Sequence, residues 1–142
     1  MRIPPLGLVG LLCVALSGCA YLPTSPKSTA LSEGVAVSIS GSAGSVKYFT
    51  FVVPFDAPGL RVDVSGGSGD ANLYLRHGAR PNDALRDCAS TLAGNVDECE
   101  IPSPVAGTWH IAVVGYEAYA NVELVADIVT PTVVASPAPG AR

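Results

Sequence analysis

The stretch that decides the fold runs from Val64 to Gly78 and reads VSGGSGDANLYLRHG. Its glycine-rich segment, residues 66–69, supplies the positive φ angles that a tight turn needs. Beyond this segment, Leu73 and Leu75 alternate with more polar residues, which is the period of two expected of a half-buried β-strand. The stretch therefore predicts the end of one strand, a turn and a second strand.

The same alternation recurs at short intervals on both sides of this stretch. Turns containing Gly or Pro separate the alternating runs, and no convincing amphipathic helix interrupts them. Six or seven short strands of this kind predict an all-β fold, an antiparallel sandwich or barrel, and we favour the β-sandwich. The runs are Val35 to Ile39, Phe49 to Val53, Leu60 to Val64, Leu73 to Leu75, Trp109 to Val113 and Val122 to Ile128.

Composition limits the classes to which the chain can belong. Its 142 residues allow one modest domain, and a hydrophobic content of 49% argues against disorder of the chain as a whole. The formal net charge is −4 and no basic cluster is present, so we expect no nucleic-acid partner. The two histidines, His77 and His110, lie outside any HExxH or GxSxG motif. We therefore expect neither enzymatic activity nor a cofactor.

The first 18 residues have the anatomy of an export signal. Arg2 precedes an uncharged apolar run that is too short, and too rich in Pro and Gly, for a comfortable transmembrane helix. Leu16-Ser17-Gly18-Cys19 resembles the bacterial lipobox, which implies that residues 1–18 are removed and that Cys19 is acylated. By the same resemblance, Ala20 in place of Asp favours the outer membrane. Ordinary secretion, with a chance cysteine near the cleavage site, is the alternative.

Composition divides the mature chain into three parts. Residues 19–32 are rich in Pro, Ser and Thr, and we expect them to form a flexible tether behind the lipid on Cys19. Residues 33–129 hold all of the alternating runs and form the predicted domain. Residues 130–142 contain three Pro and no apolar period, which predicts a disordered tail.

Cys88 and Cys99 remain as a pair once Cys13 leaves with the signal peptide and Cys19 takes the lipid. An even number of cysteines in an exported chain predicts a disulfide, and closing this loop would stabilise a small core by roughly 3 kcal/mol. A metal site or a redox thiol pair is the competing interpretation. The spacing is not CxxC and no histidine is near, so we favour the disulfide.

The glycine-rich stretch resembles the signature of bacterial pre-peptidase C-terminal domains. Val64 to Gly78, followed by Arg80-Pro81, is similar to the family pattern SGGxGDADLYVRxGxxP. The strand Lys47 to Phe51, the paired cysteines and Ala106 to Trp109 follow in the order of the family. The resemblance implies a β-sandwich of jelly-roll type that serves as an accessory or binding module and is not itself catalytic. In this chain the module would be separated from any protease and attached to a membrane.

Asp70 and Asn72 stand where the family pattern has two aspartates. Residues two apart on a strand face the same side, so the pair could share a ligand, but two oxygens are too few to hold a metal alone. Hydrogen bonds to the backbone of the glycine-rich turn are the alternative role. In collagen-binding relatives, acidic residues ahead of the second strand hold calcium, whereas residues 42–47 here contain no acid. We therefore predict no metal site and keep Asp70 and Asn72 as weak candidates.

Three tyrosines are the candidate binding residues. If Phe49 and Phe51 face the core, alternation turns Tyr48 outward, and Tyr116 and Tyr119 lie in the turn between the last two strands. An exposed tyrosine offers a flat apolar ring and a hydroxyl, which suits sugars or an extended peptide. Packing of these rings against a strand edge is the alternative.

These features predict a non-catalytic envelope protein, held by lipid on Cys19 at the outer membrane. Its domain would bind an extracellular polymer, such as a polysaccharide, or a protein such as a secreted protease. A structural envelope lipoprotein with no specific ligand is the alternative.

Overall fold

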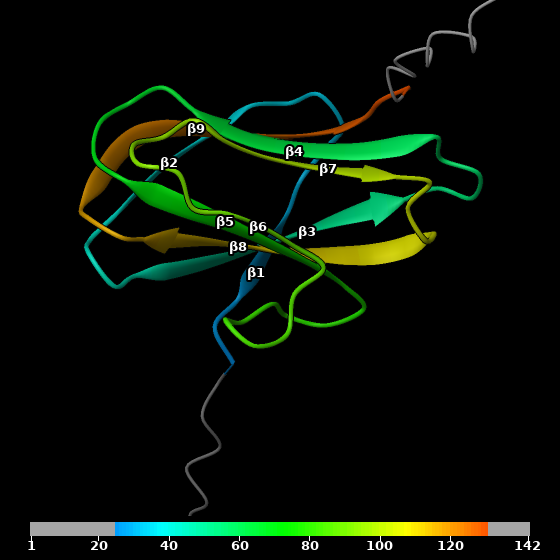
Figure 1. Ribbon diagram of the computed structural model, residues 1–142, viewed down its shortest axis with the longest axis horizontal. Coiled ribbons are helices and arrows are strands. Elements are labelled where there is room, and N and C mark those ends of the chain that lie inside the picture. Colours follow the sequence, from blue (N-terminus) through cyan, green and yellow to red (C-terminus); the bar gives the residue numbers. More distant parts are fainter. Residues whose placement is uncertain (1–24, 131–142) are drawn as a thin grey trace, which may run out of the picture.

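The computed structural model describes residues 25–130, which form nine β-strands in two sheets (Figure 1). Every neighbouring pair of strands is antiparallel except β1 and β3, which run parallel. The five-stranded sheet has the order β1 (Ser28–Ala30), β3 (Val46–Val53), β8 (Gly107–Gly115), β5 (Ala71–His77) and β6 (Cys88–Ser90). The four-stranded sheet has the order β2 (Val37–Gly41), β9 (Tyr119–Ile128), β4 (Gly59–Ser65) and β7 (Asp97–Pro102).

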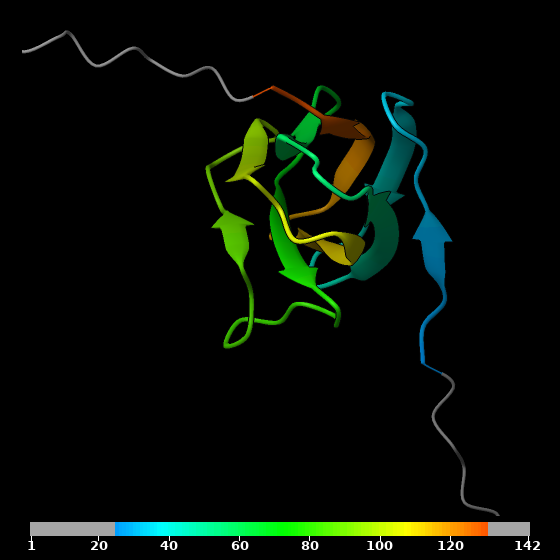
Figure 2. The same ribbon diagram turned by 90° about the vertical axis from the view of Figure 1, so that its right-hand side faces the viewer.

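The two sheets lie face to face as layers (Figure 2), which confirms the predicted all-β sandwich. Alternate side chains of the longer strands point between the layers and form one core, as the period of two requires. Phe49 and Phe51 of β3, Trp109 of β8 and Tyr119 of β9 are its large aromatic members. The aliphatic part of the core is Leu31, Ile39, Val53, Ala57, Leu60, Val62, Val64, Ala71, Leu73, Leu75, Ile111, Val113, Val122, Leu124 and Ala126.

The glycine-rich segment carries the chain from β4 in one sheet to β5 in the other. Gly67 and Gly69 have φ angles of 64° and 90°, and both lie against backbone at the end of the β8–β9 turn, Gly69 at Ala118 and Gly67 at Ala120 and Asn121 in the first residues of β9. A Cβ on Gly67 would lie 2.2 Å from the carbonyl oxygen of Ala120, and one on Gly69 would lie 2.0 Å from that of Ala118. Close backbone packing therefore requires glycine here, in addition to the φ angles.

The C-terminal end of the segment predicted to be a flexible tether, residues 19–32, is ordered in the structure. Ser28–Ala30 form β1, which pairs with Tyr48 to Thr50 of β3, and the backbone N–H of Leu31 donates to the carbonyl of Thr50 at 2.8 Å. The Leu31 side chain is 9% exposed and belongs to the core. Backbone pairing needs no alternation of side chains, so a three-residue strand leaves little trace in composition. Ordered structure thus begins before residue 33.

The predicted signal peptide, Cys19 and nearly all of the predicted tail lie outside the described residues. Within residues 25–130, the structure contains no helix of the length and hydrophobicity that crossing a membrane requires.

Candidate functional site

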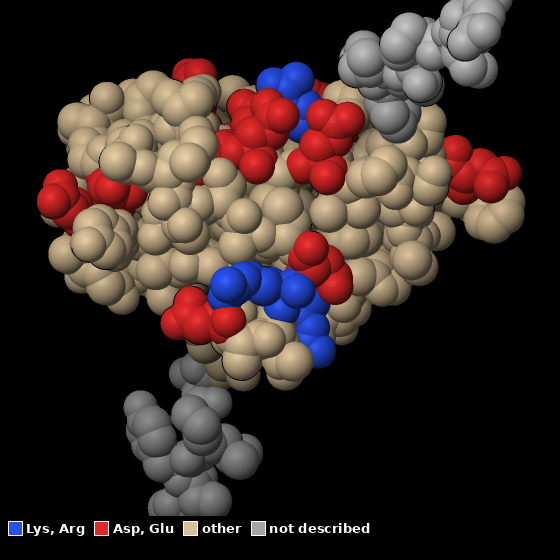
Figure 3. Space-filling model, in the orientation of Figure 1, with Lys and Arg blue, Asp and Glu red and all other residues tan. Residues whose placement is uncertain are grey.

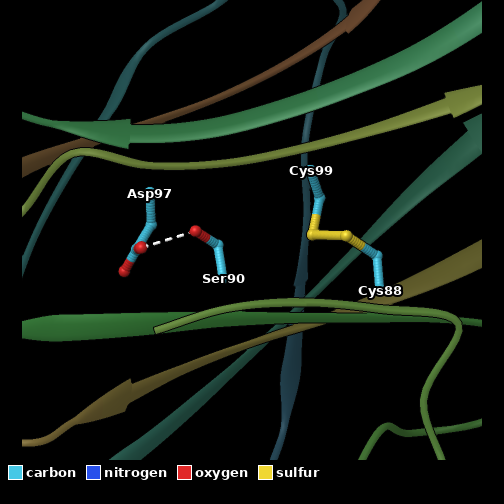
Figure 4. The surroundings of a disulfide bond; sticks show 4 residues. All are labelled: Cys88, Ser90, Asp97 and Cys99. Carbon is cyan, nitrogen blue, oxygen red and sulfur yellow. Dashed lines mark hydrogen bonds between the residues drawn. A yellow bond between two sulfur atoms is a disulfide. The ribbon is translucent and has the colours of Figure 1, made fainter. Parts of the chain in front are cut away.

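The predicted disulfide between Cys88 and Cys99 is present and joins the two sheets (Figure 4). It links β6, at the edge of the five-stranded sheet, to β7, at the edge of the four-stranded sheet, with 6.1 Å between the Cα atoms. Beside it, the buried Asp97 carboxylate accepts hydrogen bonds from the Ser90 hydroxyl at 2.6 Å and the Leu92 N–H at 2.9 Å. The cysteines and Asp97 therefore fix this side of the sandwich and do not form a binding surface.

Tyr119 is a core residue, so its prediction as a surface residue is wrong. Its side chain is 3% exposed, and burial raises the pKa of its hydroxyl. Asn121 has a φ of 54°, and the pairing of β2 with β9 shifts register near it. This β-bulge places Tyr119 and Val122 on the same side although they are three residues apart. Tyr116, in the turn before β9, is 70% exposed as predicted.

Tyr48 lies on the outer face of the five-stranded sheet, where the structure adds a second tyrosine. Tyr48 of β3 and Tyr74 of β5 both pair with Ala112 of β8, so they flank this small residue. Their Cα positions are two strand spacings apart, about 10 Å. Together with Pro81 and Asn82 they line a hollow of about 180 Å³.

The loop between β5 and β6, residues 78–87, places an arginine over each tyrosine of this hollow. The guanidinium carbon of Arg80 is 4.3 Å from the ring centre of Tyr48, and that of Arg86 is 5.5 Å from the ring centre of Tyr74. Arg80 also donates to the Ser28 hydroxyl at 3.1 Å and to the carbonyl of Pro26, so it ties the loop to β1. The loop therefore lies across the sheet with its cations held against aromatic rings.

Asp70, Asn72 and Tyr116 come together at one end of the same sheet. With Thr91 and Ala93 they line a hollow of about 360 Å³. The main-chain carbonyl of Asp70 accepts hydrogen bonds from the N–H groups of Tyr116 at 3.0 Å and Glu117 at 3.1 Å, which holds the β8–β9 turn against β5.

The side chain of Asp70 does not take the structural role considered above. Its Oδ1 is buried and has no hydrogen-bond partner in the described residues, while Ser68 and Ala120 hold the glycine-rich segment through paired backbone bonds of 3.0 Å. Residues 25–130 contain no group of three or more His, Cys, Asp and Glu side chains placed to hold a metal. Asp70 and Asn72 therefore line this hollow without forming a metal site within the described residues.

The histidines sit beside the arginine loop. His77 donates its backbone N–H to the Asp87 carboxylate at 2.7 Å, and its ring packs against Trp109 at 5.5 Å between centroids. The pKa of His110 is lowered by burial and, to a lesser extent, by the positive charges of Arg80 and His77. Among residues 25–130, the hydrogen bonds that the histidines make outside the strand pairing go to the Asp87 carboxylate and the carbonyl of Ala106, both from His77.

Tyr74, Arg80 and Arg86 are site residues that the sequence patterns did not indicate. They join Tyr48 only because β8 lies between β3 and β5, an order that the sequence does not reveal. The available signal was local: Tyr74 alternates with the buried Leu73 and Leu75, which places it on the opposite face.

Comparison with known proteins agrees with this fold. The profile of the bacterial pre-peptidase C-terminal domain matches residues 45–115, half of the chain. A zinc metalloprotease of Helicobacter pylori is 34% identical over 109 residues, which cover 76% of this chain and 42% of the protease. The chain thus spans less than half the length of the curated relatives that it matches first.

Two solved structures extend the comparison. The solution structure of vEP C-ter 100 has 36% identity and a TM-score of 0.57, and the match covers 68% of this chain and 96% of that one. The pre-peptidase C-terminal domain of a Bacillus anthracis collagenase has 15% identity and a TM-score of 0.58, with 72% and 97% covered. In secreted proteases such a domain is an accessory part and not the catalytic one. This chain belongs to the family of bacterial pre-peptidase C-terminal domains.

Proposed function

We propose that this protein is a non-catalytic, lipid-anchored envelope protein whose domain binds an extracellular polymer or a secreted protein. The observation that carries the proposal is the outer face of the five-stranded sheet. There Tyr48 and Tyr74 flank Ala112 in register, and the hollow of Asp70, Asn72 and Tyr116 follows at one end. Aromatic rings beside polar side chains are features by which surfaces recognise ligands.

The family supports the accessory part of this proposal. Four proteases match this chain over only 15% to 42% of their own length, so most of each protease lies outside the domain. The lipobox at Cys19 supports an anchored chain, which would hold whatever the domain binds close to the envelope.

Two substitutions on the proposed face test the binding role. In the full-length mature chain, Tyr48→Ala and Tyr74→Ala together are expected to weaken retention of envelope polymers or proteins by about tenfold, the equivalent of one or two exposed aromatic contacts. Phe55→Ala is the matched control, because Phe55 is an aromatic residue that is 84% exposed and lies in the loop after β3. The measurement is retention of envelope extract components on each immobilised variant.

Retention by wild type that is unchanged in the double tyrosine variant would contradict a binding role for this face. Retention of nothing by wild type would favour the structural envelope protein with no specific ligand. The anchor is tested separately by the intact mass of the chain purified from membranes. An acylated species beginning at Cys19 is expected, whereas an unmodified soluble chain would contradict the anchored part of the proposal alone.

A further inference from the structure

Acidic residues of the strands are confined to one of the two sheets. The strands of the five-stranded sheet contain no Asp or Glu, whereas those of the four-stranded sheet contain Asp63, Asp97, Glu98, Glu100, Glu123 and Asp127. Figure 3 shows acidic groups gathered over β4 and β7, and a basic group near β5 and β6. An anion is therefore repelled by one layer of the sandwich and can approach the other.

Three arginines on the side of the five-stranded sheet have no carboxylate partner. Among residues 25–130, the only arginine in an ion pair is Arg61 of β4, whose guanidinium lies 2.8 Å from Glu98 and 3.6 Å from Asp63. Arg76, Arg80 and Arg86 instead bond to backbone carbonyls, and two of them stack on tyrosine rings. Stacking fixes the plane of a guanidinium and leaves N–H groups at its edge for an incoming carboxylate.

Two carboxylates of the same loop reduce this positive charge without cancelling it. Asp87 accepts the backbone N–H of His77, and Asp83 lines the hollow beside the tyrosines. Neither lies within 4.0 Å of a Lys or Arg nitrogen in the part of the chain that the structure describes. Arg76, Arg80 and Arg86, with Lys47 of β3, exceed Asp83 and Asp87 by two positive charges, and by one when the Asp70 carboxylate at the other end of the face is counted.

The other end of the face suits hydroxyl groups. Asp70, Asn72 and Thr91 line the larger hollow with a carboxylate, an amide and a hydroxyl, and the exposed ring of Tyr116 stands beside them. Sugars present hydroxyls to such groups and apolar ring faces to an aromatic side chain. An acidic peptide presents few hydroxyls, and the flat surface of a bilayer does not enter a hollow. Along β5, Asn72 and Arg76 are four residues apart, about 13 Å. The groups that suit hydroxyls and the arginines that suit carboxylates therefore lie at separate points of one extended surface.

The geometry points to a linear polysaccharide that carries carboxylates as the ligand of this face. The arginines held over Tyr48 and Tyr74 pair with the carboxylates, and the hollow of Asp70, Asn72 and Tyr116 receives the hydroxyls of a neighbouring unit. This inference rests on the proposed binding function and specifies its ligand class.

The test compares two forms of one polymer. The probes are polygalacturonate and its methyl-esterified form, which keeps the sugar backbone and loses the charge. The protein is the full mature chain with Cys19→Ser, so that no acyl chain contributes, and binding is measured by calorimetry. We expect the ester to bind about tenfold more weakly, and the affinity for polygalacturonate to fall as ionic strength rises from about 0.05 M to about 0.5 M.

Matched variants locate the site. Arg80→Gln with Arg86→Gln is expected to weaken polygalacturonate binding about tenfold, whereas Arg61→Gln, which removes the same kind of charge from the opposite sheet, is expected to leave it unchanged. Because Arg80 also holds β1, Arg86→Gln alone is measured as well, and thermal unfolding of each variant checks that the fold is intact. Asn72→Ala is expected to weaken binding of both polymer forms.

The outcomes separate this inference from the proposed function. Equal binding of polygalacturonate and its ester would overturn the carboxylate requirement while leaving a binding module. Equal loss in the arginine variants and in Arg61→Gln would overturn the assigned face. Poly-glutamate or phosphatidylglycerol vesicles that bind as tightly as polygalacturonate would overturn the polysaccharide class. If the protein binds none of these probes, the inference is overturned. The proposed function is then still tested by the retention of envelope extract components on the tyrosine variants.

Discussion

At the scale of single residues, the glycines of residues 66–69 differ in what they do. Gly67 and Gly69 combine positive φ angles with backbone atoms closer than 2.3 Å to the place of a Cβ, whereas Gly66 has a φ of 71° and open space around it. Substituting alanine for Gly66 lowers the free energy of unfolding only because alanine disfavours the left-handed conformation, an effect of about 1–2 kcal/mol. At Gly67 or Gly69 the backbone at the end of the β8–β9 turn must move as well.

We therefore expect Gly67→Ala and Gly69→Ala to lower the free energy of unfolding by at least about 3 kcal/mol, which is a large part of the stability of a small domain. Gly66→Ala is the matched control. Chemical denaturation of the three variants measures the difference. If all three lose the same stability, φ alone accounts for these glycines and the close approach contributes nothing.

At the scale of elements, the acidic residues on the outer face of the four-stranded sheet make the ionised form of Asp63 less favourable, in addition to the effect of its burial. The pKa of Asp63 on β4 is raised above its ordinary value of 3.8, first by burial and then by Glu98 and Asp127, against the opposing effect of Arg61. An acid whose pKa is higher in the folded state binds more protons there than in the unfolded state. Folding stability is therefore lost as pH rises from the ordinary pKa through the raised one.

Asp63→Asn should remove this penalty. We expect the variant to melt at a higher temperature than wild type at pH 7, and the two to converge below pH 3.8, where Asp63 is protonated in both states. Thermal unfolding followed by circular dichroism over this range provides the measurement. A variant that is less stable than wild type at pH 7 would mean that the ion pair with Arg61 outweighs the burial of the carboxylate.

The elements that sequence analysis predicted are those whose side chains alternate between core and solvent. β3, β4, β5, β8 and β9 each present a buried residue at every second position over most of their length. Three strands were missed: β1 and β6 have three residues each, and β7 carries Asp97, Glu98 and Glu100. Their position depends on backbone pairing with a neighbour, on the disulfide, and on the hydrogen bonds of a buried carboxylate, none of which leaves a hydrophobic period.

The candidate site was less predictable than the fold for a related reason. Asp70, Asn72 and Tyr116 were named from the sequence, and the hollow that unites them depends on the β8–β9 turn packing on β5. Tyr119 was assigned to the surface because the sequence placed it in the turn between the last two strands, whereas it is the first residue of β9 and the bulge at Asn121 turns it toward the core. Tyr74, Arg80 and Arg86 required the strand order, which no local pattern specifies.

At the scale of the whole molecule, the two sheets are held together by the core and by one covalent link at their edge. Cys88 and Cys99 join β6 to β7, and both strands are short or charged and lie at the edges of their sheets. Replacing both cysteines with alanine frees the loop between them in the unfolded state. We expect this to lower the free energy of unfolding by about 3 kcal/mol on the loop-entropy account.

Chemical denaturation of the double variant, with wild type measured in the presence and absence of reductant, tests this expectation. Reduced wild type should match the double variant, since neither has the covalent link, while Asp97 and its bonds to Ser90 and Leu92 remain in both. A midpoint that does not move on reduction would show that the core alone holds β6 against β7. In that case the disulfide would not be needed for the fold outside an oxidising compartment.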